Sequence, residues 1–112
     1  MDANVSKSER QLKVEQQVLG ITQDFFQRES SGASMITVTR VLLSPDNRRA
    51  TIMISVLPRE KEKAAYGFIR RNLGELRKYV TKGLKINPVP FLDVQIDEGE
   101  KNRQKIDELL HS

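Results

Sequence analysis

The sequence of 112 residues contains no cysteine, one histidine and no long apolar run. The absence of cysteine excludes disulfide bonds and thiolate metal ligands, and it suits a reducing compartment. The histidine, His111, stands next to the last residue, a position more typical of a tail than of a general base. No apolar run approaches the roughly 20 residues that cross a bilayer, and residues 1–30 show no basic segment followed by an apolar stretch. We therefore expect a cytoplasmic protein that does not bind a membrane.

Catalytic motifs are equally scarce. The sequence has no phosphate-binding loop and no metal-ligand spacing. The neighbouring carboxylates of Asp97 and Glu98 fall at a turn, where capping a helix is a simpler role than acting on a substrate. We therefore expect no catalytic residue, no metal site and no cofactor, and we expect that the protein is not an enzyme.

Charge is distributed unevenly along the chain. Residues 58–90 carry nine Lys/Arg and three Asp/Glu, a net charge of +6, whereas residues 1–57 carry +1 and residues 91–112 carry −3. A concentrated positive segment is what a polyphosphate partner requires, because neutralising phosphates releases counterions. The alternative interpretation of the same nine cations is a solvated helix face.

The hydrophobic pattern predicts a helix followed by a β-hairpin. Ser6 with Glu9 and Ser8 with Gln11 are spaced as capping boxes, so a helix is expected to begin near residue 8 and to end before "ESSGAS". Its apolar face comprises Val14, Val18, Ile21 and Phe25. The stretches "MITVTRVLL" and "ATIMISVL", joined by "SPDNRR", predict two strands.

The first of these strands contains a change of parity. Ile36 and Val38 would share one face, and Val41 and Leu43 the other. A β-bulge near Thr39 and Arg40 would place all four apolar side chains on one face. In the second strand the apolar residues align without such a change: Ile52, Ile54 and Val56.

After Pro58 the helical period returns. One apolar stripe is compatible with two helices or with one bent helix; it comprises Ala65, Ile69, Leu73, Leu76, Val80 and Leu84. The prolines of "KINPVP" end the helical region. A third strand with Leu92, Val94 and Ile96 on one face is expected next. A short terminal helix with Ile106, Leu109 and Leu110 on one side would follow.

These elements predict an α+β domain in which helices cover a three-stranded sheet. We expect one domain over residues 1–112, with residues 1–7 and 111–112 disordered. The first six elements follow the order of a type II KH domain, a nucleic-acid-binding architecture.

Four stretches carry a resemblance to a known family: "ITVTRVLLSPDNRRATIMISV", "IRRNLGELRKYV", "VPFLDVQID" and "IDELL". From Met35 onward the chain resembles the ribosome-binding factor A family. The hairpin turn is similar through Ser44, Asp46 and Ala50, and the third strand is similar through a Val-Pro-x-Leu pattern that ends in aspartate.

The resemblance implies a KH-like domain with a helix kink in place of the usual GxxG loop, and this chain has no GxxG. The family pattern at the kink is Ala-x-Gly, and the matching positions are Asn72, Leu73 and Gly74. Asparagine departs from the pattern, although it also tolerates non-helical dihedrals. We expect a positive φ at Gly74, so that Gly74→Ala would destabilise the domain.

The resemblance also implies a monomeric assembly factor that binds the immature small (30S) ribosomal subunit and assists maturation of its 16S rRNA without catalysis. Cations beside the kink are then expected to contact phosphates: Arg70, Arg71, Arg77 and Lys78. Lys82 and Lys85 continue the segment, and Arg40 would extend the basic surface if the bulge turns it outward. Phe68 and Tyr79 either stack on bases or belong to the core, whereas solvent is the simpler environment for Arg48 and Arg49.

Two other function classes stay open. One is a general KH-like module that binds RNA or DNA away from ribosomes, and the absence of GxxG argues against it. The other is a protein-interaction domain with an acidic partner, and only the family resemblance argues against that.

Overall fold

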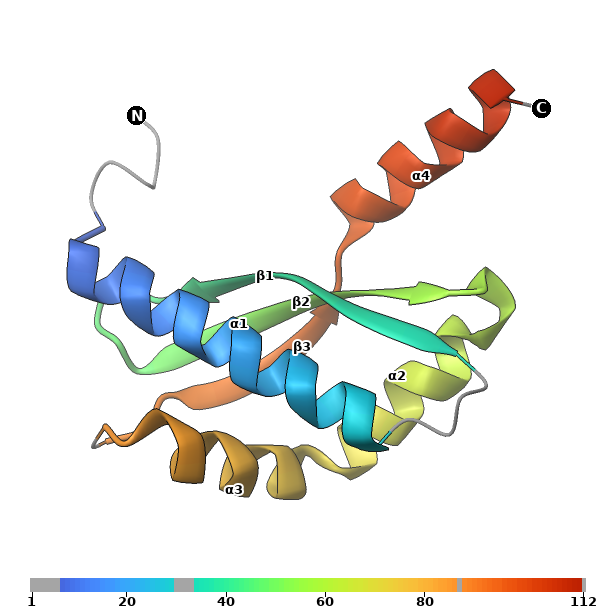
Figure 1. The fold of residues 1–112 in the computed structure, drawn as a ribbon. Coiled ribbons are helices and arrows are strands. Elements are labelled where there is room, and N and C mark those ends of the chain that lie inside the picture. Colours follow the sequence, from blue (N-terminus) through green and yellow to red (C-terminus); the bar gives the residue numbers. More distant parts are fainter. Residues whose placement is uncertain (1–6, 30–33, 87, 112) are drawn as a thin grey trace.

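The computed structural model describes residues 7–29, 34–86 and 88–111, and it shows one layer of helices packed on one sheet (Figure 1). The elements, in order, are α1 (Glu9–Glu29), β1 (Met35–Leu43), β2 (Arg49–Leu57), the 3-10 turn η2 (Arg59–Lys61), α2 (Glu62–Arg71), α3 (Leu73–Leu84), β3 (Phe91–Ile96) and α4 (Glu98–His111). This order confirms the predicted α+β class and its KH-like arrangement.

The three strands form a mixed sheet in the order β1-β2-β3. β1 pairs antiparallel with β2, and β2 pairs parallel with β3. The register of the first pair shifts between Val38 and Arg40, which confirms the predicted bulge. The bulge places four apolar side chains of β1 in the core: Ile36, Val38, Val41 and Leu43.

Helix α1 begins at one of the two predicted capping boxes. The Ser8 N–H donates to Gln11 Oε1 and the Gln11 N–H donates to Ser8 Oγ, both at 3.1 Å. The other box includes Ser6, which lies outside the described residues. Val18 and Phe25 are buried as predicted, and so are Phe26 and Thr22. The Thr22 hydroxyl can be buried because it donates to the Val18 carbonyl at 2.8 Å.

The predicted apolar stripe after Pro58 lies on two helices rather than one. All of its residues are buried in the core except Leu73, which is partly buried at the junction. α1 packs against β1 and α3, so the helical layer covers one face of the sheet. The opposite face of the sheet carries no helix (Figure 1).

Helix α4 stands away from the body of the domain (Figure 1). It lies within the predicted stretch of residues 98–112, and the three apolar residues predicted to share one side are exposed: Ile106, Leu109 and Leu110. Lys7 and His111, expected to be disordered, belong to the described residues. Lys7 pairs with Glu15, and His111 is the last residue of α4. Within the described ranges, none of the helices has the length and apolar character that a bilayer crossing demands.

Candidate nucleic-acid interface on helices α2 and α3

The junction between α2 and α3 is a break of a single residue. Asn72 has φ −112° and ψ 18°, outside the helical region. Its N–H is shared between the carbonyls of Phe68 at 3.1 Å and Ile69 at 3.0 Å, and the Leu76 N–H donates to its carbonyl at 3.0 Å. The Asn72 side-chain amide adds a donor to the Phe68 carbonyl at 2.8 Å. Because backbone hydrogen bonds continue on both sides, the chain bends at Asn72 without opening into a loop.

The expectation of a positive φ at Gly74 is wrong. Gly74 is the second residue of α3 and has a helical backbone. A Cβ built on Gly74 would meet no heavy atom within 4 Å. The physical reason is that Asn72 accepts non-helical dihedrals and supplies its own hydrogen bond at the break. The glycine is therefore not needed for the bend.

Two of the predicted cations contact β3 or the residues directly before it. Arg70 Nη1 lies 3.4 Å from Asp93 Oδ1, and its guanidinium lies 6.0 Å from the centre of the Tyr66 ring. Arg77 donates to the carbonyl of Pro90 at 2.8 Å and to that of Val89 at 3.3 Å. These two side chains are thus fixed by contacts within the domain.

The other predicted cations of α2 and α3 are free for an external partner. Arg71, Lys82 and Lys85 are exposed, and they form no ion pair with any residue that the structure describes. Lys78 has one weak partner, Glu75, at 3.5 Å on the same exposed surface. Exposed pairs of this kind contribute little, so Lys78 can exchange its carboxylate for a phosphate.

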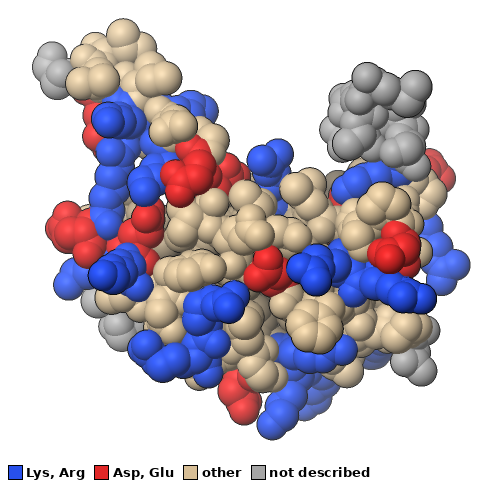
Figure 2. Space-filling view, turned by 180° about the vertical axis from the view of Figure 1, so that it is seen from behind, with Lys and Arg blue, Asp and Glu red and all other residues tan. Residues whose placement is uncertain are grey.

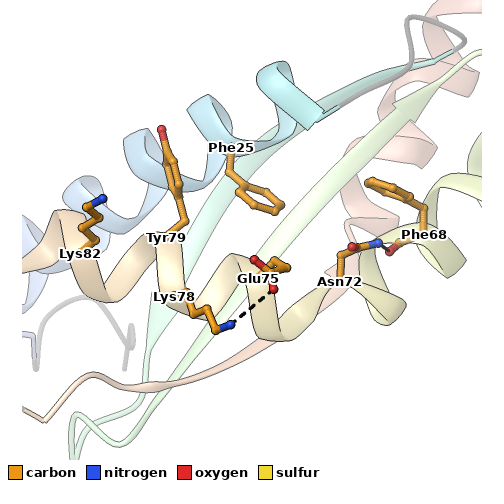
Figure 3. A pocket seen from close by; sticks show the side chains of 7 residues that line it. All are labelled: Phe25, Phe68, Asn72, Glu75, Lys78, Tyr79 and Lys82. Carbon is orange, nitrogen blue, oxygen red and sulfur yellow. Dashed lines mark hydrogen bonds and ion pairs between the residues drawn. The ribbon is translucent and has the colours of Figure 1, made fainter.

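A hollow of about 300 Å³ lies between the end of α1 and the break (Figure 3). Its lining combines aromatic rings with cations: Phe25, Phe68, Asn72, Glu75, Lys78, Tyr79 and Lys82. Tyr79 packs on Phe25 with ring centres 5.5 Å apart, and its hydroxyl donates to Asp24. That hydrogen bond raises the pKa of the Tyr79 phenol. Phe68 and Tyr79 are both partly buried against the core, which favours a packing role for them.

A second, shallower hollow lies on the outer side of α3. It is lined by Gly74, Arg77, Lys78, Thr81 and Lys82. Lys78 and Lys82 thus stand between two concave surfaces, and the bare backbone at Gly74 leaves room beside them. An extended polyanion could lie along α3 with its phosphates against this row of cations.

Arg40 does not join this surface. It is exposed, beside Val41, whose side chain is buried under the helices, so Arg40 lies on the opposite face of the sheet. There its Nε lies 3.7 Å from Asp97 Oδ2. The bulge turns Arg40 outward, but away from the cations of α2 and α3, so Arg40 does not extend their surface.

Sequence reasoning assigned no role to Phe91 and left Arg49 to solvent. In the structure Phe91 is exposed, and the Arg77 guanidinium lies 5.7 Å from the centre of its ring. The available signal was an aromatic residue at the open position of the Val-Pro-x-Leu pattern. No group of three or more His, Cys, Asp or Glu within the described ranges is arranged to hold a metal ion.

The sequence model of one family, ribosome-binding factor A, matches residues 10–110. A ribosome-binding factor A from Chelativorans is 32% identical over 111 residues, which cover 94% of this chain and 83% of that protein. Another from Fervidobacterium nodosum is 35% identical over 80 residues, which cover 70% of this chain and 64% of that protein. In the latter comparison the match spans less than two thirds of the relative.

Solved structures show the same fold. The crystal structure of ribosome-binding factor A from Thermus thermophilus matches with a TM-score of 0.68 and 17% identity, covering 77% of this chain and 94% of that one. A homology model of the Thermus thermophilus protein, fitted into a cryo-electron microscopy map of a 30S complex, matches with a TM-score of 0.61 and 15% identity. It covers 83% of this chain and 97% of the fitted one.

Proposed function

Because the chain belongs to the ribosome-binding factor A family, we propose that it binds the small (30S) ribosomal subunit and assists maturation of the 16S rRNA. It does so in the cytoplasm, as a monomer, by binding alone and without a cofactor. The Thermus thermophilus relative in a 30S complex supports this choice of partner.

The observation that carries the proposal is the row of uncommitted cations along α2 and α3. Figure 2 views the molecule from the side opposite to α1 and shows Lys and Arg spread over its lower part with some acidic side chains among them, whereas acidic side chains gather beside the projecting α4. Arg71 lies in the last turn of α2, and Lys78 and Lys82 lie one turn apart on α3. Such cations position a protein on nucleic acid through the phosphate backbone.

The N-terminus of α3 adds to this field, whereas the C-terminus of α2, which meets it at Asn72, carries the opposite partial charge. The N-terminus of α3 directs unpaired backbone N–H groups and a partial positive charge toward the break. Arg71 stands directly before it, and Gly74 leaves the backbone of the first turn accessible. The break therefore offers both side-chain and backbone donors to a phosphate.

The proposal is tested by sedimentation of the protein with purified small subunits at low and high salt. We expect co-sedimentation at low salt that declines steeply as salt rises. A variant with glutamine at four positions, Arg70, Arg71, Arg77 and Lys78, should bind more weakly and with a shallower salt dependence. The matched control neutralises four exposed cations on α1 and α4: Arg10, Lys13, Arg103 and Lys105.

Two results would contradict the proposal. Equal losses in both variants would show that only net charge matters and that α2 and α3 hold no site. Equal affinity for small subunits and for unrelated RNA of similar length would point to a general RNA-binding module.

A further inference from the structure

An aromatic side chain stands on the sheet face that the helices leave bare. Phe91 opens β3 and is 69% exposed, whereas the next residue, Leu92, is buried under the helices. Because successive side chains of a strand alternate between the two faces, the Phe91 ring points away from the helices. A single exposed apolar side chain is ordinary in itself, so its neighbours decide whether it has a role.

Two arginines lie beside Phe91. The Arg77 guanidinium lies 5.7 Å from the ring centre and is anchored on the Pro90 and Val89 carbonyls. Arg49 is the register partner of Phe91 in the parallel pair β2–β3. Partners across a ladder share a face and stand roughly 5 Å apart, so Arg49 borders the ring on the other side.

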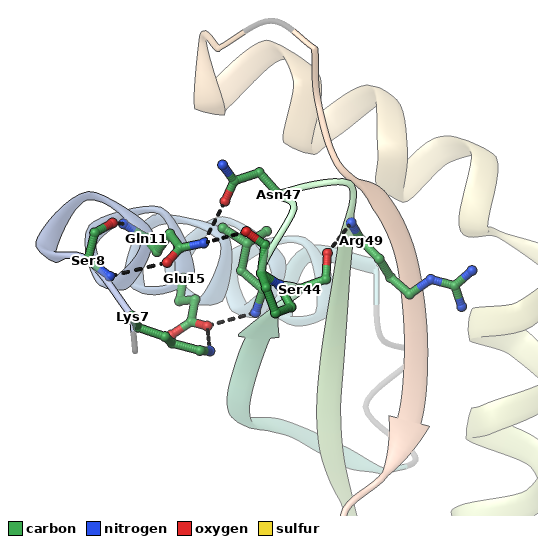
Figure 4. A network of polar contacts seen from close by, with 9 residues as sticks. Lys7, Ser8, Gln11, Glu15, Ser44, Asn47 and Arg49 are labelled. Carbon is green, nitrogen blue, oxygen red and sulfur yellow. Dashed lines mark hydrogen bonds and ion pairs between the residues drawn. The ribbon is translucent and has the colours of Figure 1, made fainter. Parts of the chain in front are cut away.

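Among the described residues, the side chain of Arg49 has no hydrogen-bond partner. Figure 4 shows it extended away from Ser44, in the direction of β3. Its guanidinium forms no ion pair with any residue in the described part of the chain. An exposed ring between an anchored and a free guanidinium combines a stacking surface with two phosphate ligands.

The backbone under these side chains is fixed. The Arg49 N–H donates to Ser44 Oγ at 3.0 Å, and the Phe91 N–H donates to the Arg48 carbonyl at 2.8 Å. The hairpin turn is tied to α1 because the Gln11 amide donates to Asn47 Oδ1 at 2.8 Å (Figure 4). A ring mounted on such a base loses little freedom when a ligand binds.

The surroundings favour a nucleobase over an apolar protein surface. The neighbours that follow on the same face, Thr51 and Asp93, are polar, and the exposed Leu42 lies beyond Thr51 on β1, so the apolar surface next to the ring is small. The Asp93 carboxylate pairs with Arg70 at 3.4 Å and accepts a hydrogen bond from the Gln95 amide at 2.9 Å. These contacts reduce the repulsion between Asp93 and a phosphate bound nearby. One ring with two cations matches one base and its adjoining phosphates.

We propose that Phe91, Arg49 and Arg77 form a stacking site for one unpaired nucleobase of RNA. The base lies on the free face of the Phe91 ring, and the two guanidinium groups bind the phosphates on either side of it. This inference rests on the proposed function, because it names a second contact with rRNA on the face opposite to the helices. Stacking on the Phe91 ring and contacts to phosphates do not depend on which base is bound, so we expect the site to accept any base.

The chain has no tryptophan, so the Phe91→Trp protein carries a single fluorescent reporter at this position. We expect its emission to be quenched on titration with a single-stranded 12-nucleotide RNA, and not with an RNA duplex of the same length, whose bases are already stacked. The matched control is Met35→Trp. Met35 is 66% exposed at the far end of the sheet, opposite Leu57, and its emission should not change.

Affinity gives an independent measurement. Phe91→Ala should weaken binding of the single-stranded RNA by about 5- to 20-fold without changing the salt slope, because no charge is removed. Arg49→Gln should weaken binding and reduce the salt slope by about one phosphate contact. Met35→Ala should change neither quantity.

The possible failures are distinguishable. RNA binding by the Phe91→Trp protein without quenching, together with normal affinity of Phe91→Ala, would overturn the stacking site while leaving the proposed function intact. Loss of small-subunit binding by the unmodified chain would overturn both.

Discussion

Asn72 and Gly74 show how two residues with similar local preferences come to have different roles. Both are poor helix formers, and the sequence placed them two positions apart within one apolar stripe. The apolar stripe alone left one bent helix and two helices open, and the family resemblance implied a kink at residues 72–74. The residue that absorbs the break could not be predicted, because the choice depends on the hydrogen bond from the Asn72 amide to the Phe68 carbonyl.

Gly74→Ala should raise the free energy of unfolding by up to about 1 kcal/mol. Alanine favours the helix and narrows the unfolded ensemble, and its Cβ would meet no atom within 4 Å. Urea melts of the two proteins measure the difference. A lower stability of the variant would mean that Gly74 has a strained backbone in solution.

Gly83 provides the internal comparison for this prediction because it lies in the same helix. A Cβ on Gly83 would approach Ile21 Cδ1 to 3.0 Å and Cγ1 to 3.3 Å. Ile21 must shift to make room, so Gly83→Ala should be less stable than Gly74→Ala. Equal stability of the two variants would show that α1 and α3 pack more loosely than the structure indicates.

At the scale of whole elements, side chains from helices contact both edge strands of the sheet or the residues directly before them. Along β3 the contacts come from Arg70, Arg77 and the Tyr66 hydroxyl, which donates to the Val94 carbonyl at 3.0 Å. Along β1 they come from α1. The Gln23 amide donates to the Ile36 carbonyl at 3.1 Å and accepts from the Val38 N–H at 2.7 Å, as a neighbouring strand would.

Gln23→Ala should lower the free energy of unfolding by about 1–2 kcal/mol, because two backbone groups of β1 lose their partner. The exposed edge should also promote self-association. Urea melts and sedimentation equilibrium measure the two effects. Gln17→Ala, on the exposed side of the same helix, is the control and should change neither.

Helix α4 is attached to the sheet through Asp97. This buried carboxylate accepts a hydrogen bond from the Glu100 N–H at 3.0 Å, which caps α4. It also accepts a hydrogen bond from the Thr39 hydroxyl at 2.6 Å, which connects the cap to the β1 bulge. Burial raises the pKa of Asp97. The hydrogen bonds from Thr39 and Glu100, together with Arg40, outweigh that effect and hold the pKa below its ordinary value of 3.8.

A lowered pKa in the folded state means that the charged form stabilises the fold. The contribution of Asp97 is therefore present above pH 3.8 and is lost as the pH falls through the lower folded value. Asp97→Asn keeps a capping side chain and removes the charge, so it should cost about 1 kcal/mol at pH 6 and progressively less toward pH 2. Urea melts over that pH range give the result, and a constant difference would argue against a charged Asp97 in the fold.

The hydrophobic pattern of the strands and helices predicted some features of the fold and not others. The parity change in β1 was sufficient to predict the bulge, because a buried sheet face leaves no other way to accommodate both pairs of apolar residues. The role of Gln23 could not be predicted. It depends on how α1 crosses β1, and the helical period alone does not set that angle.

The whole molecule is flat, with extents of 46 × 36 × 17 Å. A single helical layer on a single sheet gives two broad faces, which carry different charged and aromatic side chains. The helical layer carries Arg71, Lys78 and Lys82, whereas the bare sheet face carries Arg40, Arg49 and the Phe91 ring with Arg77 beside it. The net charge of each segment could be calculated from the sequence. The face on which each charged side chain lies could not, because it depends on the register of the strands.

The cations of residues 70–85 fall into two groups: those that the proposal assigns to RNA alone, and those that also make contacts within the domain. Glutamine at Arg71, Lys82 and Lys85 removes three charges that have no ion-pair partner among the described residues. We expect a clear loss of affinity for small subunits, a reduction of the salt slope by two to three phosphate contacts, and a change of stability within about 0.5 kcal/mol.

Glutamine at Arg70 and Arg77 should act differently, since both side chains connect the helices to β3. Arg70 loses its contact with Asp93, and Arg77 loses two hydrogen bonds to the carbonyls before Phe91. We expect a loss of about 1–2 kcal/mol in the free energy of unfolding, together with weaker binding. Salt titrations and urea melts of the two variants separate the effects, and the decisive comparison is stability. If the triple variant proved the less stable of the two, these cations would have to be part of the fold; if it kept its affinity for small subunits, the phosphate-binding surface would have to lie on the sheet face instead.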